Sequence, residues 1–189
     1  MSGAVRKSGT AERHVALLRG INVGGKNKLL MADLVELFEA AGCTAVKTYI
    51  QSGNVVFAAS PKVAAVLAGR IPERIEEEFG LRVPIVLRSA AEFGTTVRSN
   101  PFLELGADPD ALHVAFLREK PDKAHVAALD PGRSPGDSFQ LRGRELFLHL
   151  PNGVARTKLS SAYLDKTLGT VCTARNWRTV QKIHELVAP

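Results

Sequence analysis

The glycine-rich segment Gly20–Asn27 (GINVGGKN) is the part of this sequence most suggestive of chemistry. It follows an apolar run typical of a buried strand, and it fits the spacing of glycines and lysine found in phosphate-binding loops. Asn27 stands where such a loop needs Ser or Thr to ligate Mg²⁺, so nucleotide hydrolysis is not indicated. The amides of Gly24 and Gly25, with Lys26 beside them, can still bind a phosphate. A solvated turn explains the same pattern, and both interpretations stay open.

A second basic loop, Pro151–Lys158 (PNGVARTK), precedes a predicted helix that begins near Thr157. The first turn of a helix offers unpaired amides and the positive end of its dipole to an anion. Arg156 and Lys158 would add positive charge at that position. An ordinary capped helix entry is the alternative interpretation.

The C-terminal segment has helical spacing over residues 175–187. Its apolar face comprises Trp177, Val180, Ile183, His184 and Val187, and its basic face comprises Arg175, Arg178 and Lys182. Trp177 is therefore predicted to anchor the core. Asn176 lies toward the apolar side, so its amide should either cap nearby backbone or hold a ligand. Thr173 is the candidate N-cap.

These three segments supply the predicted ligand-binding residues, namely Arg19, Asn22, Gly24, Gly25, Lys26, Arg156, Lys158, Arg175, Asn176 and Arg178. No catalytic residue is identified. The five histidines show no metal-ligand spacing, and Cys43 and Cys172 are too far apart to suggest a redox or metal pair. The sequence therefore indicates neither a cofactor nor a metal.

Composition favours an anionic partner. The chain of 189 residues has a net charge of +6, and Val154–Lys182 contains six Lys or Arg residues against Asp165 alone, a balance of +5. No apolar run approaches the ~20 residues that span a bilayer. The first dozen residues have no apolar signal-peptide core. A cytoplasmic protein without membrane contact is expected.

The elements that must position these residues alternate in a recognisable order. In the first half, strands are predicted over 14–19, 46–51, 54–58 and 83–87, with helices over 31–41 and 60–79. Gly69 and Pro72 should kink or interrupt the second helix. A capping box, Ser89–Glu92, begins a connecting helix. The order β-α-β-β-α-β is that of a ferredoxin-like unit.

The second half repeats this pattern after a boundary at 100–110, which is rich in Pro and Gly. Strands are predicted over 112–117, 138–141, 145–150 and 170–173, with helices over 122–129, 157–168 and 175–187. Sequence identity between the halves is not evident, so the repeat is one of pattern. We predict an α+β fold of two tandem ferredoxin-like units with an extra C-terminal helix. The expected divisions are a flexible tail over 1–12, a first unit over 13–99 and a second unit over 110–189.

This topology leads to an expectation about the loops. The two basic loops should lie at equivalent ends of their units, and the hairpin tip Ser52–Asn54 should lie at the opposite end of its sheet. The sequence does not indicate whether the two loops share a cleft.

Three blocks give the chain a resemblance to the bacterial DUF1697 family. They are LLRGINVGGKNKLLMADL (Leu17–Leu34), TYIQSGNVVF (Thr48–Phe57) and TARNWRTVQK (Thr173–Lys182), with LHVAFL (Leu112–Leu117) between them. The resemblance covers nearly the whole chain after the tail. One departure is Thr157, where the family usually shows Ser before Lys-Leu, but the hydroxyl is retained. The resemblance implies an α+β fold and a bacterial cytosolic protein of unknown function, and it brings no established catalytic residues.

Three functional hypotheses follow. The first is a protein that binds a phosphate-bearing anionic ligand, with nucleic acid as the favoured partner. The second is an enzyme acting on a small phosphorylated or nucleotide substrate. The third is a protein-interaction module, for which this fold is a common vehicle. The sequence does not decide whether the chain is an enzyme, and it does not indicate an oligomeric state.

Overall fold

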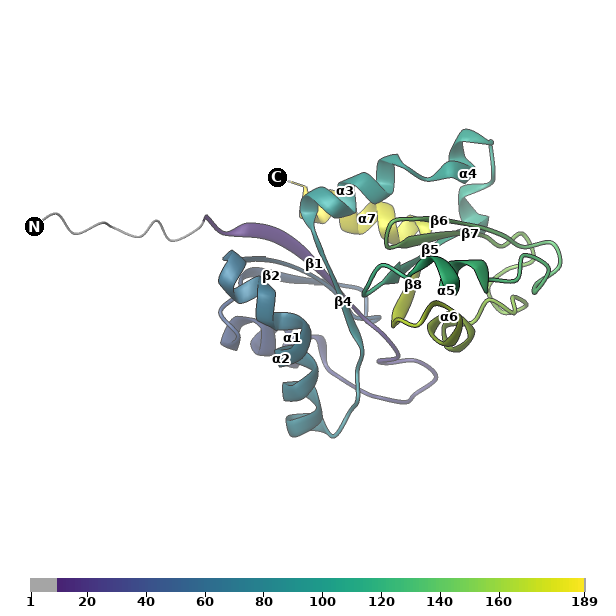
Figure 1. Cartoon of the computed structure of the whole chain (residues 1–189). Helices are drawn as coiled ribbons and strands as arrows, with labels where there is room; N and C mark the ends of the chain where they lie inside the picture. The colour runs from purple at the N-terminus through teal and green to yellow at the C-terminus, as the bar shows by residue number, and fades with distance from the viewer. Residues whose placement is uncertain (1–9, 189) are drawn as a thin grey trace, which may run out of the picture.

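A computed structural model describes residues 10–188 of the chain, so residues 1–9 of the predicted tail lie outside the described residues. The first unit, coloured purple to teal in Figure 1, has strands β1 (Glu12–Leu18), β2 (Thr44–Tyr49), β3 (Asn54–Ala59) and β4 (Ile85–Ser89). Its helices are α1 (Met31–Ala40), α2 (Pro61–Phe79) and α3 (Ala90–Arg98).

Two short pieces, α4 (Pro101–Glu104) and the 3₁₀ turn η1 (Pro109–Ala111), join the units. The second unit has strands β5 (Leu112–Leu117), β6 (Ser138–Arg142), β7 (Glu145–His149) and β8 (Cys172–Asn176). Its helices are α5 (Lys123–Ala127), α6 (Ser161–Leu168) and α7 (Trp177–Val187).

The two sheets have the same antiparallel strand order, β2-β3-β1-β4 and β6-β7-β5-β8. This confirms the predicted α+β fold with two tandem ferredoxin-like units. The extra C-terminal helix also has a counterpart, because α3 follows β4 directly just as α7 follows β8. The helices α3 and α7 lie side by side against the sheets (Figure 1).

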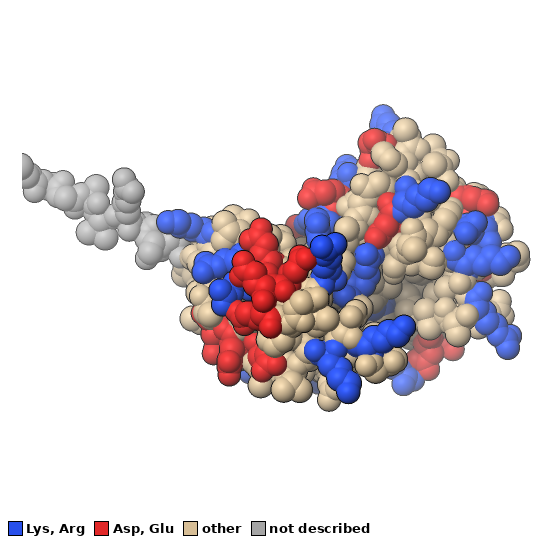
Figure 2. Space-filling model, turned by 90° about the horizontal axis from the view of Figure 1, so that it is seen from below, with Lys and Arg blue, Asp and Glu red and all other residues tan. Residues whose placement is uncertain are grey.

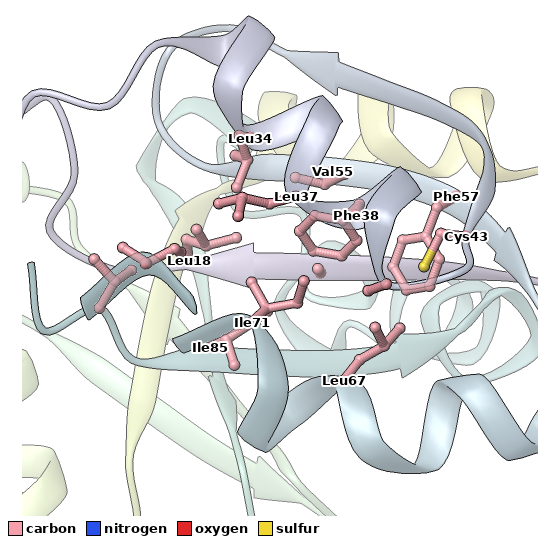
Figure 3. Close-up of a cluster of buried hydrophobic side chains, with 14 of the residues drawn as sticks. Leu18, Leu34, Leu37, Phe38, Cys43, Val55, Phe57, Leu67, Ile71 and Ile85 are labelled. Carbon is pink, nitrogen blue, oxygen red and sulfur yellow. The ribbon is translucent and has the colours of Figure 1, made fainter. Parts of the chain in front are cut away.

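Successive side chains of the central strands point to opposite faces of each sheet, so the apolar side chains form three separate clusters. Ala16 and Leu18 of β1 face α1 and α2, where Phe38 packs against Phe57 with ring centroids 5.1 Å apart (Figure 3). The opposite face of β1 contributes Val15 to a central cluster that also contains residues of β5, β7 and α7. A third cluster lies between the second sheet and its helices α5 and α6. The central cluster contains side chains of both units, so they share this part of the interior.

Strand pairing reveals a sequence repeat that the order of predicted helices and strands did not show. His14–Arg19 (HVALLR) and His113–Arg118 (HVAFLR) occupy the same place in the two sheets and differ only at Leu17 and Phe116. The prediction that the halves share only a pattern was therefore wrong for the central strands.

Three predicted helix boundaries are corrected. The helix α2 runs unbroken through Pro72, so the predicted interruption does not occur. The helix α6 begins at Ser161, because the side chain of Ser160 accepts from the amide of Tyr163, and not near Thr157. The helix α7 begins at Trp177 and not at residue 175, because β8 continues to Asn176.

The expectation about loop ends was also wrong. The amide of Leu18 donates to the carbonyl of Gly53 at 2.8 Å, so the β2–β3 hairpin tip lies beside the β1–α1 loop. The reason is that β2 runs in the same direction as β1. The C-terminal ends of both strands therefore lie at the same end of the sheet. The β7–α6 loop lies at the other end of its own sheet, beside the start of β5.

None of the described helices is both long and apolar enough to cross a membrane.

Candidate functional site

The two units contact each other through two reciprocal junctions, each built around a buried arginine. Arg88 is the fourth residue of β4, and Arg175 is the fourth residue of β8. They are equivalent by strand register, since Arg88 pairs with Val15 and Arg175 pairs with Val114. Each side chain reaches across to the opposite unit.

At the first junction, Arg88 is neutralised. Its Nη2 donates to the carbonyls of Leu117 at 2.7 Å and Arg144 at 3.1 Å, and its Nε donates to Glu145 Oε1 at 2.7 Å. Burial lowers the pKa of Arg88, and the carboxylate of Glu145 opposes this shift. A second carboxylate, that of Glu92, accepts from Arg144 at 2.6 Å. Arg88 and Arg144 therefore each have an acidic partner at this junction.

At the second junction, the arginine has only neutral partners. The Nη2 of Arg175 donates to the carbonyls of Leu18 at 2.7 Å and Ser52 at 3.2 Å, while its Nε donates to Asn54 Oδ1 at 2.5 Å. Its Nη1 donates to Thr173 Oγ1 and to the carbonyl of Ala174, each at 2.8 Å. Every N–H of the guanidinium is used, but within residues 10–188 no carboxylate pairs with it.

Burial lowers the pKa of Arg175 to about 10, so the group keeps its positive charge at neutral pH. An unpaired charge in the protein interior is costly unless another charge compensates it. The second junction therefore contains a cation whose charge the described residues do not balance.

The difference between the junctions comes from three changes at equivalent positions, one of which places Gly53 where the first junction has Arg144. Glu145 is the first residue of β7, and Asn54 is the first residue of β3. Glu92 is the third residue of α3 after its cap Ser89, and Thr179 is the third residue of α7 after its cap Asn176. The second junction thus lacks the whole pair of Arg144 with Glu92, and it has the neutral Asn54 where the first junction has Glu145, the partner of Arg88.

A hollow of about 430 Å³ opens at this second junction, and we refer to it as the inter-unit hollow. It is lined by the β1–α1 loop, the β2–β3 hairpin, the start of β5, the β7–α6 loop and the β8–α7 connection. Its charged lining consists of Arg19 and Arg175, and no carboxylate belongs to it. Ser161 and Thr179 bring the first turns of α6 and α7 to its wall.

Arg19 connects the two units at one side of the inter-unit hollow. Its Nη1 donates to Asp165 Oδ2 at 2.7 Å and to the carbonyl of Cys172 at 2.8 Å. The equivalent Arg118 donates to the carbonyl of Ile85 at 3.3 Å. Arg19 therefore has a compensating acid, in contrast to Arg175.

Two buried polar atoms near the hollow have no hydrogen-bond partner among the described residues, Nδ1 of His113 and Nε1 of Trp177. Burial lowers the pKa of His113, so its imidazole is neutral at pH 7. Trp177 is 1% exposed, as expected for the predicted core anchor. Both residues also line a neighbouring hollow of about 340 Å³, which contains the ion pair between Arg178 and Asp110.

The structure brings some of the predicted ligand-binding residues together and separates others. Arg19, Arg175 and Asn176 line the inter-unit hollow, and Arg178 lines its neighbour. Asn22 and Gly25 line a different hollow beside α1. The remaining predicted residues are exposed and lie outside the lining of these hollows: Gly24, Lys26, Arg156 and Lys158.

Two of the predicted residues have clear structural roles. Asn22, with φ of 54°, donates to the carbonyls of Leu29 at 2.8 Å and Gln51 at 3.0 Å and accepts from the amide of Leu29 at 2.9 Å, which closes the loop. Asn176 is exposed rather than buried, and its Oδ1 accepts from the amide of Thr179 at 2.8 Å. It is thus the cap of α7, and the suggestion that Thr173 caps this helix was wrong.

Sequence reasoning missed Ser52 and Asn54, because the hairpin was expected at the far end of the sheet. It missed Thr179 because the start of α7 was placed two residues too early. A usable signal was present. Aligning HVALLR with HVAFLR would have matched Arg19 with Arg118 and shown which positions of the two halves are equivalent.

Nucleophilic and metal chemistry have little support. Burial raises the pKa of Cys43 to about 11 and that of Cys172 to about 12, so both thiols stay protonated. In the described part of the chain, no three His, Cys, Asp or Glu side chains are grouped so as to hold a metal ion.

Comparison with known proteins identifies a family and a fold. The sequence model of DUF1697, a protein of unknown function, matches residues 11–147. The solved structure of the conserved bacterial protein SP0830 from Streptococcus pneumoniae is similar, with a TM-score of 0.70 and 24% identity. The similarity covers 94% of this chain and 99% of that chain. At this identity it shows the fold alone. No curated protein sequence matches the chain.

Proposed function

The chain belongs to DUF1697, a family of unknown function, and we propose that it binds a phosphate-bearing anion in the inter-unit hollow. The observation that carries this proposal is the unequal neutralisation of two equivalent arginines. Arg88 has Glu145 as its partner, whereas Arg175 has the neutral Asn54. A bound anion would supply the missing negative charge.

Electrostatics support an anion at this position. A buried cation attracts an anion more strongly than an exposed one does, because the interior screens less than water. Arg175 contributes its charge at a distance, since its donors are already used by the protein. The positive end of the α7 dipole lies at the same wall, since Asn176 and Thr179 line the hollow. The direct contacts would come from the hydroxyls of Ser52, Thr173 and Thr179, which also line it.

The arrangement of the loops also supports a ligand. The three sequence blocks that carry the family resemblance meet at this hollow, through Arg19 of the first, Ser52 of the second and Arg175 of the third. They are separated by up to 156 positions in the chain, between Arg19 and Arg175. Arg175 holds the other two blocks by hydrogen bonds to Leu18 and Ser52.

A small ligand fits better than a nucleic acid strand. The uncompensated charge lies in a concave site, while several exposed arginines and lysines already pair with acids, namely Arg74, Arg82, Arg178 and Lys182. Figure 2, which views the molecule from below, shows acidic side chains gathered over α1 and α2. These helices contain Asp33, Glu36, Glu39, Glu73, Glu76, Glu77 and Glu78. Such a surface would repel a polyanion.

The test restores the missing carboxylate. We expect pyrophosphate to bind the parent protein at low ionic strength in isothermal titration calorimetry. Asn54→Asp, which has the same shape, should lower the affinity at least tenfold, because the new carboxylate takes the place of the anion beside Arg175. The amide of Asn54 also donates to the carbonyl of Tyr49 at 3.1 Å, so circular dichroism must show that the variant is folded.

A second position separates charge from size. Thr179→Glu introduces the acid found at the equivalent Glu92, and Thr179→Gln introduces a side chain of equal size without the charge. The Glu variant should lose far more affinity than the Gln variant. Gln181→Glu, on the exposed surface of α7, adds the same charge outside the hollow and should leave binding unchanged.

The proposal fails if pyrophosphate does not bind, or if Asn54→Asp and Thr179→Glu bind it as the parent does. Tight binding of a mixed-sequence oligonucleotide that survives both substitutions would instead favour a nucleic acid on another surface.

A further inference from the structure

The rim of the inter-unit hollow is apolar although its floor is cationic. Val23, Ile50 and Val154 line it, and they are 64%, 52% and 61% exposed. They come from three separate connections, namely the β1–α1 loop, the β2–β3 hairpin and the β7–α6 loop. Single exposed apolar residues are common on proteins, but three that converge from different loops on one concavity require a specific explanation.

Ile50 is the most informative of the three, because it is both exposed and strained. Its φ of 48° lies in the left-handed region, which branched side chains rarely adopt and which costs of order 1–3 kcal/mol. Residues such as Gly or Asn would fit this turn without that strain. The protein therefore keeps a water-exposed isoleucine at a position where local stability favours another residue. Contact with a ligand gives a reason for this choice.

From this arrangement we infer that the anion is the phosphate of a nucleotide-sized molecule, whose flat ring lies among Val23, Ile50 and Val154. This inference rests on the proposed function and specifies its ligand class as a nucleoside monophosphate. The phosphate would lie toward Arg175 and the first turn of α7, and the ring would cover the apolar rim. The volume of about 430 Å³ is in the range of pockets that hold small organic ligands.

The surroundings disfavour a longer apolar ligand. The neighbouring hollow, which shares His113, Val154 and Asn176, contains the ion pair between Arg178 and Asp110. An acyl chain extended in that direction would have to desolvate these charges. A compact ring on a phosphate matches both the extent and the polarity of the site.

The test compares AMP with ribose 5-phosphate by isothermal titration calorimetry. The two share a phosphate and a sugar, and only AMP has the ring. We expect AMP to bind at least tenfold more tightly, since burying one branched apolar side chain is worth about 1.5 kcal/mol or more. Ribose 5-phosphate should bind more weakly, through the phosphate alone.

Variants of the rim test the location. Ile50→Asn should lower the affinity for AMP at least fivefold and leave ribose 5-phosphate unchanged. The same substitution should raise the melting temperature, because Asn accepts the left-handed backbone. Val154→Ser should also weaken AMP alone. Leu105→Ser, at a residue that is 79% exposed and outside the hollow, is the matched control and should change neither ligand.

The outcomes separate the two proposals. Equal affinities for AMP and ribose 5-phosphate would overturn the nucleotide inference and leave the anion site intact. Tighter binding of AMP that both rim variants retain would also overturn it, since the ring would then lie elsewhere. If neither compound nor pyrophosphate binds, the proposed function itself fails.

Discussion

His14 and His113 occupy equivalent positions near the starts of β1 and β5, and both are affected by burial. Burial lowers the pKa of each imidazole below its ordinary value, and nearby Glu12 and Glu92 only partly oppose the shift at His14. A buried histidine resists protonation because the charged form loses its hydration. In the unfolded chain both residues titrate near pH 6.5.

This difference predicts acid sensitivity. As pH falls from 7 to 5, the unfolded state takes up protons before the folded state does, so the free energy of unfolding decreases. His14→Gln removes one of these groups and should make the decrease smaller, by up to about 1 kcal/mol. Urea unfolding at pH 7 and pH 5 measures the effect. An equal decrease in the parent and the variant would show that His14 does not contribute.

Residue by residue, the sequence predicted the core more reliably than the site. Trp177 was assigned to the core because its spacing with Val180 and Ile183 defines one helical face, and that argument needs only local geometry. Arg175 was placed on the solvent-exposed face of the same helix, but it belongs to a strand. The environment of Arg175 depends on Leu18 and Asn54, which are distant in the chain, so local periodicity contains no information about it.

At the scale of elements, the β2–β3 hairpin is fixed against β1 by Gly53. This residue has φ of 77°, and a Cβ added to it would lie 2.7 Å from Cβ of Leu18 and 3.1 Å from Cδ1 of Ile21. The first distance is shorter than real side chains permit. Gly53 therefore sets how closely the hairpin approaches the strand that leads into the β1–α1 loop.

Gly53→Ala should destabilise the protein by about 2–4 kcal/mol, through backbone strain and overpacking together. Urea unfolding provides the measurement. The matched control is Gly69→Ala in α2, where an added Cβ meets nothing within 4 Å and the helix should gain up to about 1 kcal/mol. A Gly53→Ala protein as stable as the parent would contradict the close approach described here.

Element boundaries that depend on local features were predicted well. Boundaries that depend on a choice between two caps, or on pairing with a distant strand, were not. The caps Ser60 and Ser89 marked the starts of α2 and α3, because a hydroxyl that accepts from the helix backbone is a local feature. The start of α6 was placed too early, since Thr157 and Ser160 both qualify as caps and only the fold selects Ser160. The end of β8 was misjudged because pairing with β5 extends the strand to Asn176.

At the scale of the whole molecule, the central cluster makes the two units interdependent. Val15 and Val86 of the first unit pack in the same cluster as Val114, Phe116 and Trp177 of the second. The buried ion pair of Arg88 with Glu145 crosses the same boundary. Separation of the units would expose these groups to water at a large cost in free energy.

We therefore expect the chain to unfold in a single cooperative transition. Calorimetric and van't Hoff enthalpies should agree, and fluorescence of Trp177 in the second unit should report the same midpoint as far-ultraviolet circular dichroism of both units. Two separate transitions would contradict the shared interior. The sequence predicted the two units from their order of elements, but it could not predict how they pack, because that depends on pairs of faces far apart in the chain.

The central claim is that an anion binds where the second junction lacks its carboxylates. Its most direct test is a ¹⁵N–¹H correlation spectrum of the full chain titrated with pyrophosphate. We predict saturable shifts concentrated in residues 19–23, at Ser52 and in residues 173–179, and their loss in Asn54→Asp. Shifts confined to exposed lysines such as Lys26 and Lys158, or no saturable shifts, would contradict the claim.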